Sequence, residues 1–123
     1  MNNTLYREEI LEHFKNPQNW GTVKEADFAI DDNNPLCGDS IHLTGKISKN
    51  RITDVKFTGE GCVISKASAS ILTEYAKGKD TEEIQKLNQQ NFLSLLEIPL
   101  TAARLKCALL PYSALQKALK KVE

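Results

Sequence analysis

Apolar and polar residues alternate between residues 39 and 58 of the chain. The apolar positions of this stretch are Ile41, Leu43, Ile47, Val55 and Phe57. Alternation with a period of two is typical of strands that bury one face, so the pattern predicts a β-hairpin with its turn at residues 48–51. Phe28 and Ile30 predict a further short strand, which ends in a turn at residues 31–34.

Elsewhere the apolar residues recur every three or four positions, which predicts amphipathic helices. These helices cover residues 4–15, 65–77, 81–87, 92–96 and a last segment from about 107 to 122. The last helix should not start earlier, because Pro111 would break a helix running through from Thr101 but is tolerated in a first turn. This start would place the Cys107 thiol at a helix N-terminus, where the partial positive charge stabilises a thiolate.

Together, these patterns predict an α+β fold. We expect a small antiparallel sheet of about three strands, packed on one face against several α-helices. The chain has 123 residues, the length of one domain, which would span residues 1–123.

The charge balance narrows the classes of partner. Sixteen basic and sixteen acidic side chains cancel, so no overall field attracts nucleic acid or an anionic membrane, and neither is expected as a partner. No apolar run is long enough for a membrane span. An odd cysteine count without a secretory signal argues against a disulfide framework and favours a reducing cytoplasm.

The candidate chemistry lies in a stretch from Asn34 to Asp39 and in two distant cysteines. Cys37 and Asp39 are two residues apart, so in an extended segment they project from the same face. With Cys62 and Cys107 they make four ligands of the kind that Zn²⁺ accepts in tetrahedral geometry. The hairpin would bring Cys62 back towards Cys37. Scattered cysteines can equally be small buried apolar residues, so the spacing alone leaves both interpretations open.

Several short motifs carry a resemblance that covers nearly the whole chain. They are Cys37-Gly38-Asp39, Gly59-Glu60-Gly61-Cys62 with the run from Ser65 to Ser70, Glu74 to Lys79, and Arg104-Leu105-Lys106-Cys107. This set resembles the U-type iron–sulfur assembly proteins, the family of IscU, SufU and the N-terminal domain of NifU. The resemblance implies a SufE/NifU-like architecture, and it implies that Cys37, Asp39, Cys62 and Cys107 hold Zn²⁺ or a transient [2Fe–2S] cluster. It also implies a cysteine desulfurase as sulfur donor, and a downstream iron–sulfur carrier or apo-proteins as recipients.

The chain departs from the family pattern in features that distinguish the scaffold type from the SufU type, and it matches neither type fully. Scaffold-type members carry a histidine before the last cysteine, where this chain has Lys106, and a Leu-Pro-Pro-Val-Lys segment for an Hsp70-type chaperone, which residues 98–102 lack. Arg104, Lys106 and Cys107 resemble the SufU type instead, but the usual SufU insertion before the last cysteine has no room here. The leading function is an assembly protein that accepts persulfide sulfur and serves as scaffold for a nascent cluster. The alternatives are a zinc-dependent sulfurtransferase without a scaffold role and a zinc-stabilised binding module.

Among the three thiols, Cys37 is the predicted persulfide acceptor. Pro35, Gly38 and the nearby acidic residues are features of an exposed loop, whereas Cys62 leads into a close-packed helix. We expect the desulfurase to displace Cys37 from the metal, while the other three ligands retain the ion. Arg104 and Lys106 could supply positive charge beside Cys107, or they could be ordinary surface cations.

Overall fold

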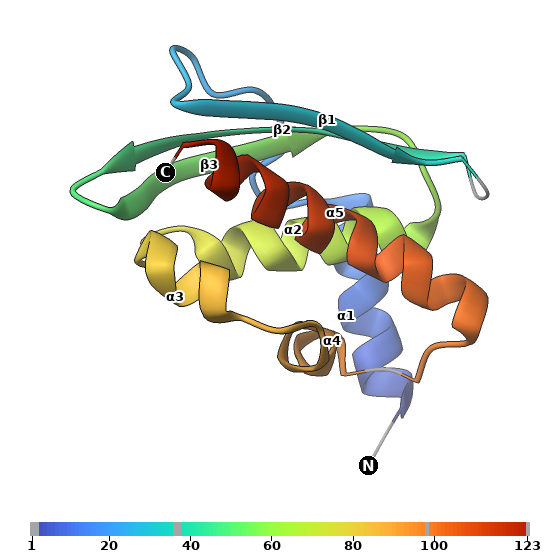
Figure 1. Cartoon of the computed structure of the whole chain (residues 1–123). Helices are drawn as coiled ribbons and strands as arrows, with labels where there is room; N and C mark the ends of the chain where they lie inside the picture. The colour runs from blue at the N-terminus through green and yellow to red at the C-terminus, as the bar shows by residue number, and fades with distance from the viewer. Residues whose placement is uncertain (1–2, 36–37, 98, 123) are drawn as a thin grey trace.

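The structure is a computed structural model that describes residues 3–35, 38–97 and 99–122. The described residues form three strands and five helices, which confirms the expected α+β class (Figure 1). The strands are β1 (Phe28–Asn34), β2 (Asp39–Ser48) and β3 (Arg51–Thr58). The helices are α1 (Asn3–Lys15), α2 (Val63–Ala76), α3 (Thr81–Lys86), α4 (Gln89–Leu96) and α5 (Ala102–Lys121).

Strand β2 is the centre of the sheet, and both of its neighbours run antiparallel to it. Leu43 of β2 lies opposite Ile30 of β1 and Phe57 of β3, and all three side chains are buried. The alternation in the sequence therefore sets the register, because a shift by one residue would turn the apolar side chains outward.

The prediction of a turn at residues 31–34 was wrong, because these polar residues continue strand β1. They pair in register with β2 down to Asn34 opposite Asp39. The carboxylate of Asp31 lies 2.8 Å from His42 Nδ1, and the carboxylate of Asp32 accepts a hydrogen bond of 3.0 Å from Lys117. Pairing with a neighbouring strand thus overrides a local turn preference. The connection between β1 and β2 is instead made by residues 35–38, where Gly38 has a φ of +71°.

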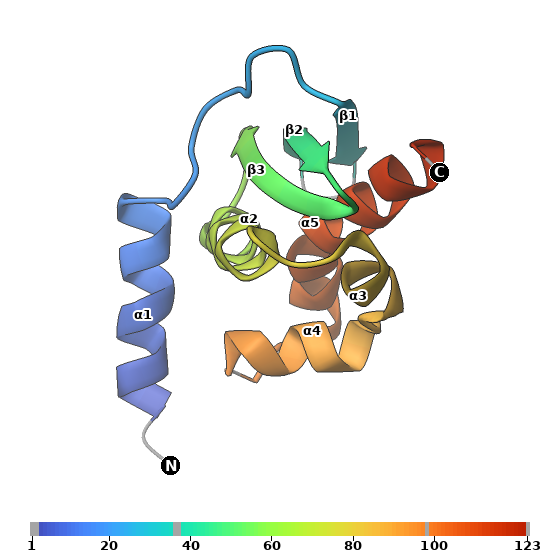
Figure 2. The ribbon, with the colours of Figure 1, turned by 90° about the vertical axis from the view of Figure 1, so that its left-hand side faces the viewer.

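Helices α2 and α5 cover one face of the sheet, as Figure 2 shows from the strand ends. The residues packed between these layers form one apolar cluster, in which Leu43, Ile52, Val55, Phe57 and Leu72 are almost completely buried. Helix α1 packs on α2, whereas α4 packs on both α2 and α5. This arrangement brings the start of α2 and the first half of α5 to the same end of the sheet.

The predicted start of the last helix was wrong, since α5 begins at Ala102 and contains Pro111 in its interior. The hydroxyl oxygen of Thr101 accepts a hydrogen bond from the main-chain N–H of Arg104, which caps the helix at this earlier point. Cys107 therefore lies in the second turn of α5, and the partial charge of the helix N-terminus does not act on it as expected.

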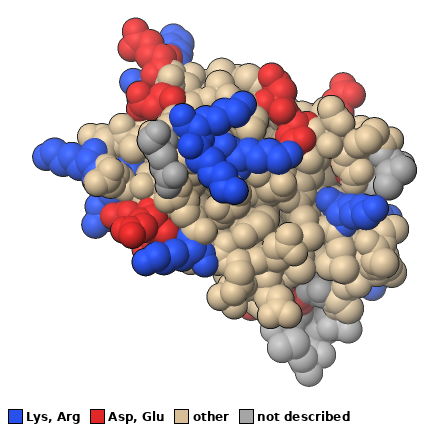
Figure 3. Space-filling model, viewed as in Figure 1, with Lys and Arg blue, Asp and Glu red and all other residues tan. Residues whose placement is uncertain are grey.

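Charged side chains of both signs share the surface seen in Figure 3. Basic side chains gather over the last part of α5, whose final turn carries Lys120 and Lys121, and acidic side chains lie around them. Within the described ranges, no helix combines the length and the apolar character needed to cross a membrane.

Candidate metal centre

Three of the four predicted ligands meet at one end of the sheet. Asp39 is the first residue of β2, Cys62 directly precedes α2, and Cys107 lies in α5. Because β3 runs antiparallel to β2, the chain leaving β3 returns to the start of β2, where the Ser40 N–H donates to the Glu60 carbonyl at 2.7 Å. One carboxylate oxygen and the two sulfurs lie within 4.8 Å of one another.

The carboxylate of Asp39 is buried, with 1% of the residue exposed. Its Oδ1 accepts a hydrogen bond of 3.0 Å from the main-chain N–H of Cys62, which ties the strand to the start of α2. Its Oδ2 is buried and has no hydrogen-bond partner among the described residues. A buried carboxylate oxygen without a partner is costly, and a cation beside it removes that cost. The chemistry of this donor set therefore fits a metal ion.

Gly61 leaves space for this carboxylate. A Cβ atom at position 61 would collide with Asp39 Oδ1 and with the hydroxyl of Ser65. The Ser65 hydroxyl in turn donates to the Cys62 carbonyl at 3.1 Å. The absence of a side chain at Gly61 thus lets the loop, the carboxylate and the first turn of α2 approach closely.

Cys62 is the N-cap residue of α2 and is half-buried. Burial raises the pKa of its thiol, and so does the nearby charge of Asp39. Hydrogen bonds from the Ser65 main-chain N–H and from the Cys107 thiol favour the thiolate and outweigh both, so the pKa is below its usual value. The helix N-terminus that we expected to act on Cys107 therefore acts on Cys62 instead.

Cys107 is the more buried of the two described candidate sulfur ligands, with 2% of the residue exposed. Its Sγ lies 3.8 Å from the carbonyl oxygen of Ala103, one turn earlier in α5. The side chain is buried and carried by α5, so its position depends on where α5 packs.

Cys37, the fourth predicted ligand and the predicted persulfide acceptor, lies outside the described residues. Its described neighbours Pro35 and Gly38 are exposed, and the Gly38 N–H donates to the Asn34 carbonyl at 3.0 Å. Asn34 and Asp39 form the last pair of the β1–β2 ladder. The sheet therefore holds the chain on both sides of residues 35–38.

Arg104 and Lys106 are both exposed on α5, and they border different grooves. Arg104 lines an open groove with Cys62, Val63 and Leu100. Lys106 lines a second groove with Asn34, at the end of β1. The two cations therefore flank the cluster on two sides, and their electrostatic role stays a prediction.

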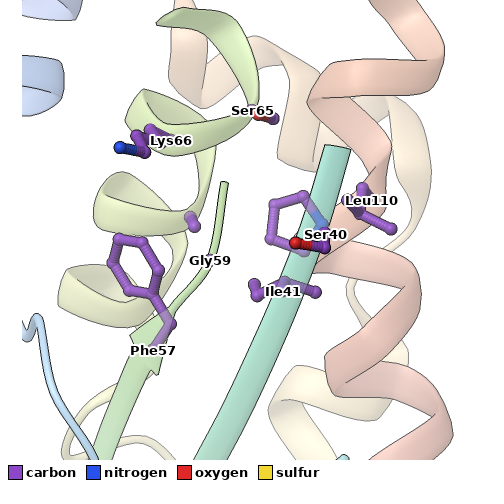
Figure 4. A pocket seen from close by; sticks show the side chains of 9 residues that line it. Ser40, Ile41, Phe57, Gly59, Ser65, Lys66 and Leu110 are labelled. Atoms are coloured by element: carbon purple, nitrogen blue, oxygen red, sulfur yellow. The ribbon is translucent and has the colours of Figure 1, made fainter. Parts of the chain in front are cut away.

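A small cavity lies next to the cluster, between the sheet and helices α2 and α5 (Figure 4). Ile41, Phe57 and Leu110 line it together with Ser40 and Ser65. Its volume of about 10 Å³ holds at most roughly one water molecule. This cavity is too small for an organic substrate.

Sequence reasoning missed the supporting residues Gly61 and Ser65. The short spacing between Gly61, Cys62 and Ser65 was visible, but the role of Gly61 depends on its close approach to Asp39, more than twenty residues earlier. Both histidines have partners outside the cluster: His13 Nδ1 is 2.7 Å from the Ser70 hydroxyl, and His42 contacts Asp31.

Comparison with protein families places the sequence in a known group. Residues 5–123 match the NifU-like N terminal domain. The zinc-dependent sulfurtransferase SufU of Bacillus subtilis is 39% identical over 137 aligned positions, which cover 98% of this chain and 92% of that protein. The alignment is longer than this chain, so that relative contains segments that this chain lacks. The iron–sulfur cluster assembly scaffold protein IscU 1 of Archaeoglobus fulgidus is 36% identical over 115 positions, covering 94% of this chain and 74% of that protein.

Solved structures share the fold. A protein from Fervidobacterium islandicum, described as an iron–sulfur cluster assembly scaffold for the SUF system, superposes with a TM-score of 0.80 at 27% identity. The match covers 97% of this chain and 99% of that chain. A NifU-like protein (N-terminal) from Brucella abortus has a TM-score of 0.82 at 20% identity, over 98% of this chain and 95% of that chain, which shows the shared fold.

Proposed function

This chain belongs to the NifU-like N-terminal domain family, and on that premise we propose that it is an iron–sulfur cluster assembly protein. It accepts sulfur from a cysteine desulfurase and holds a nascent cluster before transfer to a downstream carrier or apo-protein. One observation supports this most strongly. The buried Asp39 carboxylate, one oxygen of which has no hydrogen-bond partner among the described residues, lies beside two cysteine sulfurs, and the third cysteine is only two residues away in the sequence.

Asp39, Cys62 and Cys107 are the proposed fixed ligands, and Cys37 is the proposed fourth. Two to three thiolates with one carboxylate suit Zn²⁺, which stabilises the anionic form of its cysteine ligands when bound. Carboxylate is a harder ligand than thiolate, so a site with Asp39 holds soft metals less tightly than a site of four cysteines. Such a site is suited to exchange of its contents.

Sulfur uptake needs a thiolate that can leave the cluster and reach into a partner's active site. The Cys37 thiolate attacks the terminal sulfur of the desulfurase persulfide. The sulfur–sulfur bond of the donor breaks, its cysteine leaves as a thiolate, and Cys37 carries the persulfide. Cys62 and Cys107 are less suited, because the first begins α2 and the second is buried in α5.

The runner-up is a zinc-dependent sulfurtransferase without a scaffold role. Two observations favour it: the 39% identity to a protein of that name, and Lys106 in place of a further metal-binding side chain beside Cys107. In that case zinc would be the resident metal, and the persulfide on Cys37 would be the only product.

Anaerobic incubation with a cysteine desulfurase, cysteine and ferrous iron separates these functions. A scaffold gains the visible absorption of an iron–sulfur cluster that stays with this chain on gel filtration. A carrier gains a persulfide without that absorption. Cys107→Ser, in which a buried ligand is changed and the β1–β2 loop is intact, should lose cluster formation but still accept sulfur on Cys37. A chain that gains neither product would contradict the proposal.

A further inference from the structure

We infer that Ser68 is a positioning residue for the candidate metal centre, since its hydroxyl fixes α5 on α2 and thereby sets where Cys107 lies. Ser68 is in the second turn of α2 and is 0% exposed. Its hydroxyl donates a hydrogen bond of 2.6 Å to the carbonyl oxygen of Ala108, the residue that follows Cys107. The inference rests on the proposed function only in taking Asp39, Cys62 and Cys107 as metal ligands.

The other hydroxyl groups of α2 show that this contact is not required by the helix itself. A buried serine or threonine in a helix can satisfy its hydroxyl on a carbonyl of the preceding turn. Ser65 and Thr73 do so, donating to the carbonyls of Cys62 and Ser70 at 3.1 and 3.0 Å. Ser68 instead donates across to another helix, to a carbonyl that has a main-chain partner by its place inside α5.

The geometry of the cluster explains why such a contact matters. Cys62 belongs to the start of α2 and Cys107 to α5, so the distance between their sulfurs depends on how the two helices are placed. Ala108, the residue of α5 that Ser68 contacts, is small and fully buried. Small apolar side chains allow close approach but hold the axial position of a helix only weakly, whereas a hydrogen bond fixes distance and direction.

The candidate metal centre tolerates only a small displacement of the Cys107 sulfur. A slide of α5 by one residue moves Cys107 by about 1.5 Å along the helix axis. The bond from zinc to a cysteine sulfur is about 2.3 Å long, so this slide would remove Cys107 from coordination. Pro111, one turn after Cys107, has no N–H to donate and weakens α5 at this point. The Ser68 hydroxyl thus binds α5 close to the point where Pro111 removes one helical hydrogen bond.

Zinc affinity, measured by competition with a chromophoric chelator, tests the inference. Ser68→Ala should weaken binding by roughly 10- to 100-fold, the range seen when a residue that orients a ligand is lost. Ser70→Ala is the matched control, because Ser70 is an equally buried serine of α2 that contacts His13 and Gln18 instead of α5. This control should bind zinc within about twofold of the wild type, and far-UV circular dichroism of the metal-free variants verifies that both fold.

A second measurement separates positioning from general destabilisation. In a Cys107→Ser background, Ser68→Ala should cost no further zinc affinity, because the ligand that it positions is gone. The Co²⁺-substituted Ser68→Ala protein should also show weaker thiolate-to-cobalt charge-transfer absorption than the wild type. Equal losses in both backgrounds, an unchanged affinity, or an equal loss in Ser70→Ala would overturn the inference. A wild type that binds no zinc would overturn the metal centre of the proposed function as well, so the two failures are distinguishable.

Discussion

Asp39 has two positions of interest: it lies two residues from Cys37 in the sequence, and it is the first residue of strand β2, at the edge of the candidate site. The structure buries its side chain, uses one oxygen to fix the Cys62 main chain, and leaves the other oxygen without a partner among the described residues. Without a cation, this arrangement is unfavourable, because a buried charge has lost its hydration without full compensation. We therefore expect Asp39 to increase the affinity for a cation and to lower the stability of the metal-free protein.

Asp39→Asn should separate the effect of the Asp39 charge on zinc affinity from its effect on the stability of the metal-free protein. The amide oxygen can still accept from the Cys62 N–H, but the charge is lost, so zinc affinity should fall by at least about tenfold. The metal-free variant should be as stable as the wild type or more stable by about 1 kcal/mol, because a buried charge is removed. Chelator competition and urea unfolding measure the two quantities. Asp54→Asn, which removes an equal charge from a partly exposed ion pair with Lys77, should change neither by much. A destabilised metal-free Asp39→Asn protein with normal zinc affinity would contradict this account.

Individual residues also show which parts of the candidate site could be predicted from the sequence. The carboxylate and the two described thiols were predictable, because their residue types and family motifs point to soft-metal chemistry. The roles of Gly61 and Ser68 were not predictable, because each depends on a contact with a residue far away in the sequence. The role of Ser68 needs the packing of α5 on α2, forty residues apart in the sequence.

The secondary-structure elements differ from prediction in two places, and in both a long-range contact outweighs a local preference. The polar residues 31–34 favour a turn by composition, yet pairing with β2 and the contact of Lys117 with Asp32 keep them extended. Pro111 disfavours a helix interior, yet α5 continues through it because its side chain is buried in the core. Threonine is a common N-cap residue, so Thr101 was a visible signal for the earlier helix start, but the prediction rested on Pro111 alone.

Pro111→Ala compares the cost of a proline inside α5 with the stabilisation from burying its ring. A proline in a helix interior costs roughly 3 kcal/mol relative to alanine, whereas losing part of a buried ring costs about 1–2 kcal/mol. The variant should therefore raise the free energy of unfolding of the metal-free protein by about 1 kcal/mol, as measured by urea unfolding. A decrease would mean that the packing of Pro111 against the sheet outweighs the strain that it causes.

In the whole molecule, the apolar core and the candidate metal centre are separate. The apolar cluster runs through the sheet, α2, α3, α4 and α5 and does not include Asp39, Cys62 or Cys107, which lie together at one end of the sheet. A small zinc-stabilised module has too little core to fold without its metal, whereas an assembly protein should fold around a site that exchanges.

Removal of zinc should therefore leave the fold intact. After chelation, the far-UV circular dichroism spectrum should be retained, and thermal unfolding should remain cooperative at a lower temperature. The loss corresponds to about 3 kcal/mol when the wild type is compared at free zinc roughly 100-fold above its dissociation constant. Loss of helical signal on chelation would favour the binding module over the assembly protein.

The central claim is that Cys37 receives sulfur while Asp39, Cys62 and Cys107 hold the metal. Peptide mass spectrometry after reaction with a cysteine desulfurase and cysteine, without iron, tests it most directly. The wild type should gain sulfur on the peptide with Cys37, and Cys37→Ser should gain none while retaining its zinc and its circular dichroism spectrum. Sulfur on Cys62 or Cys107 in the wild type, together with normal uptake by Cys37→Ser, would contradict the account.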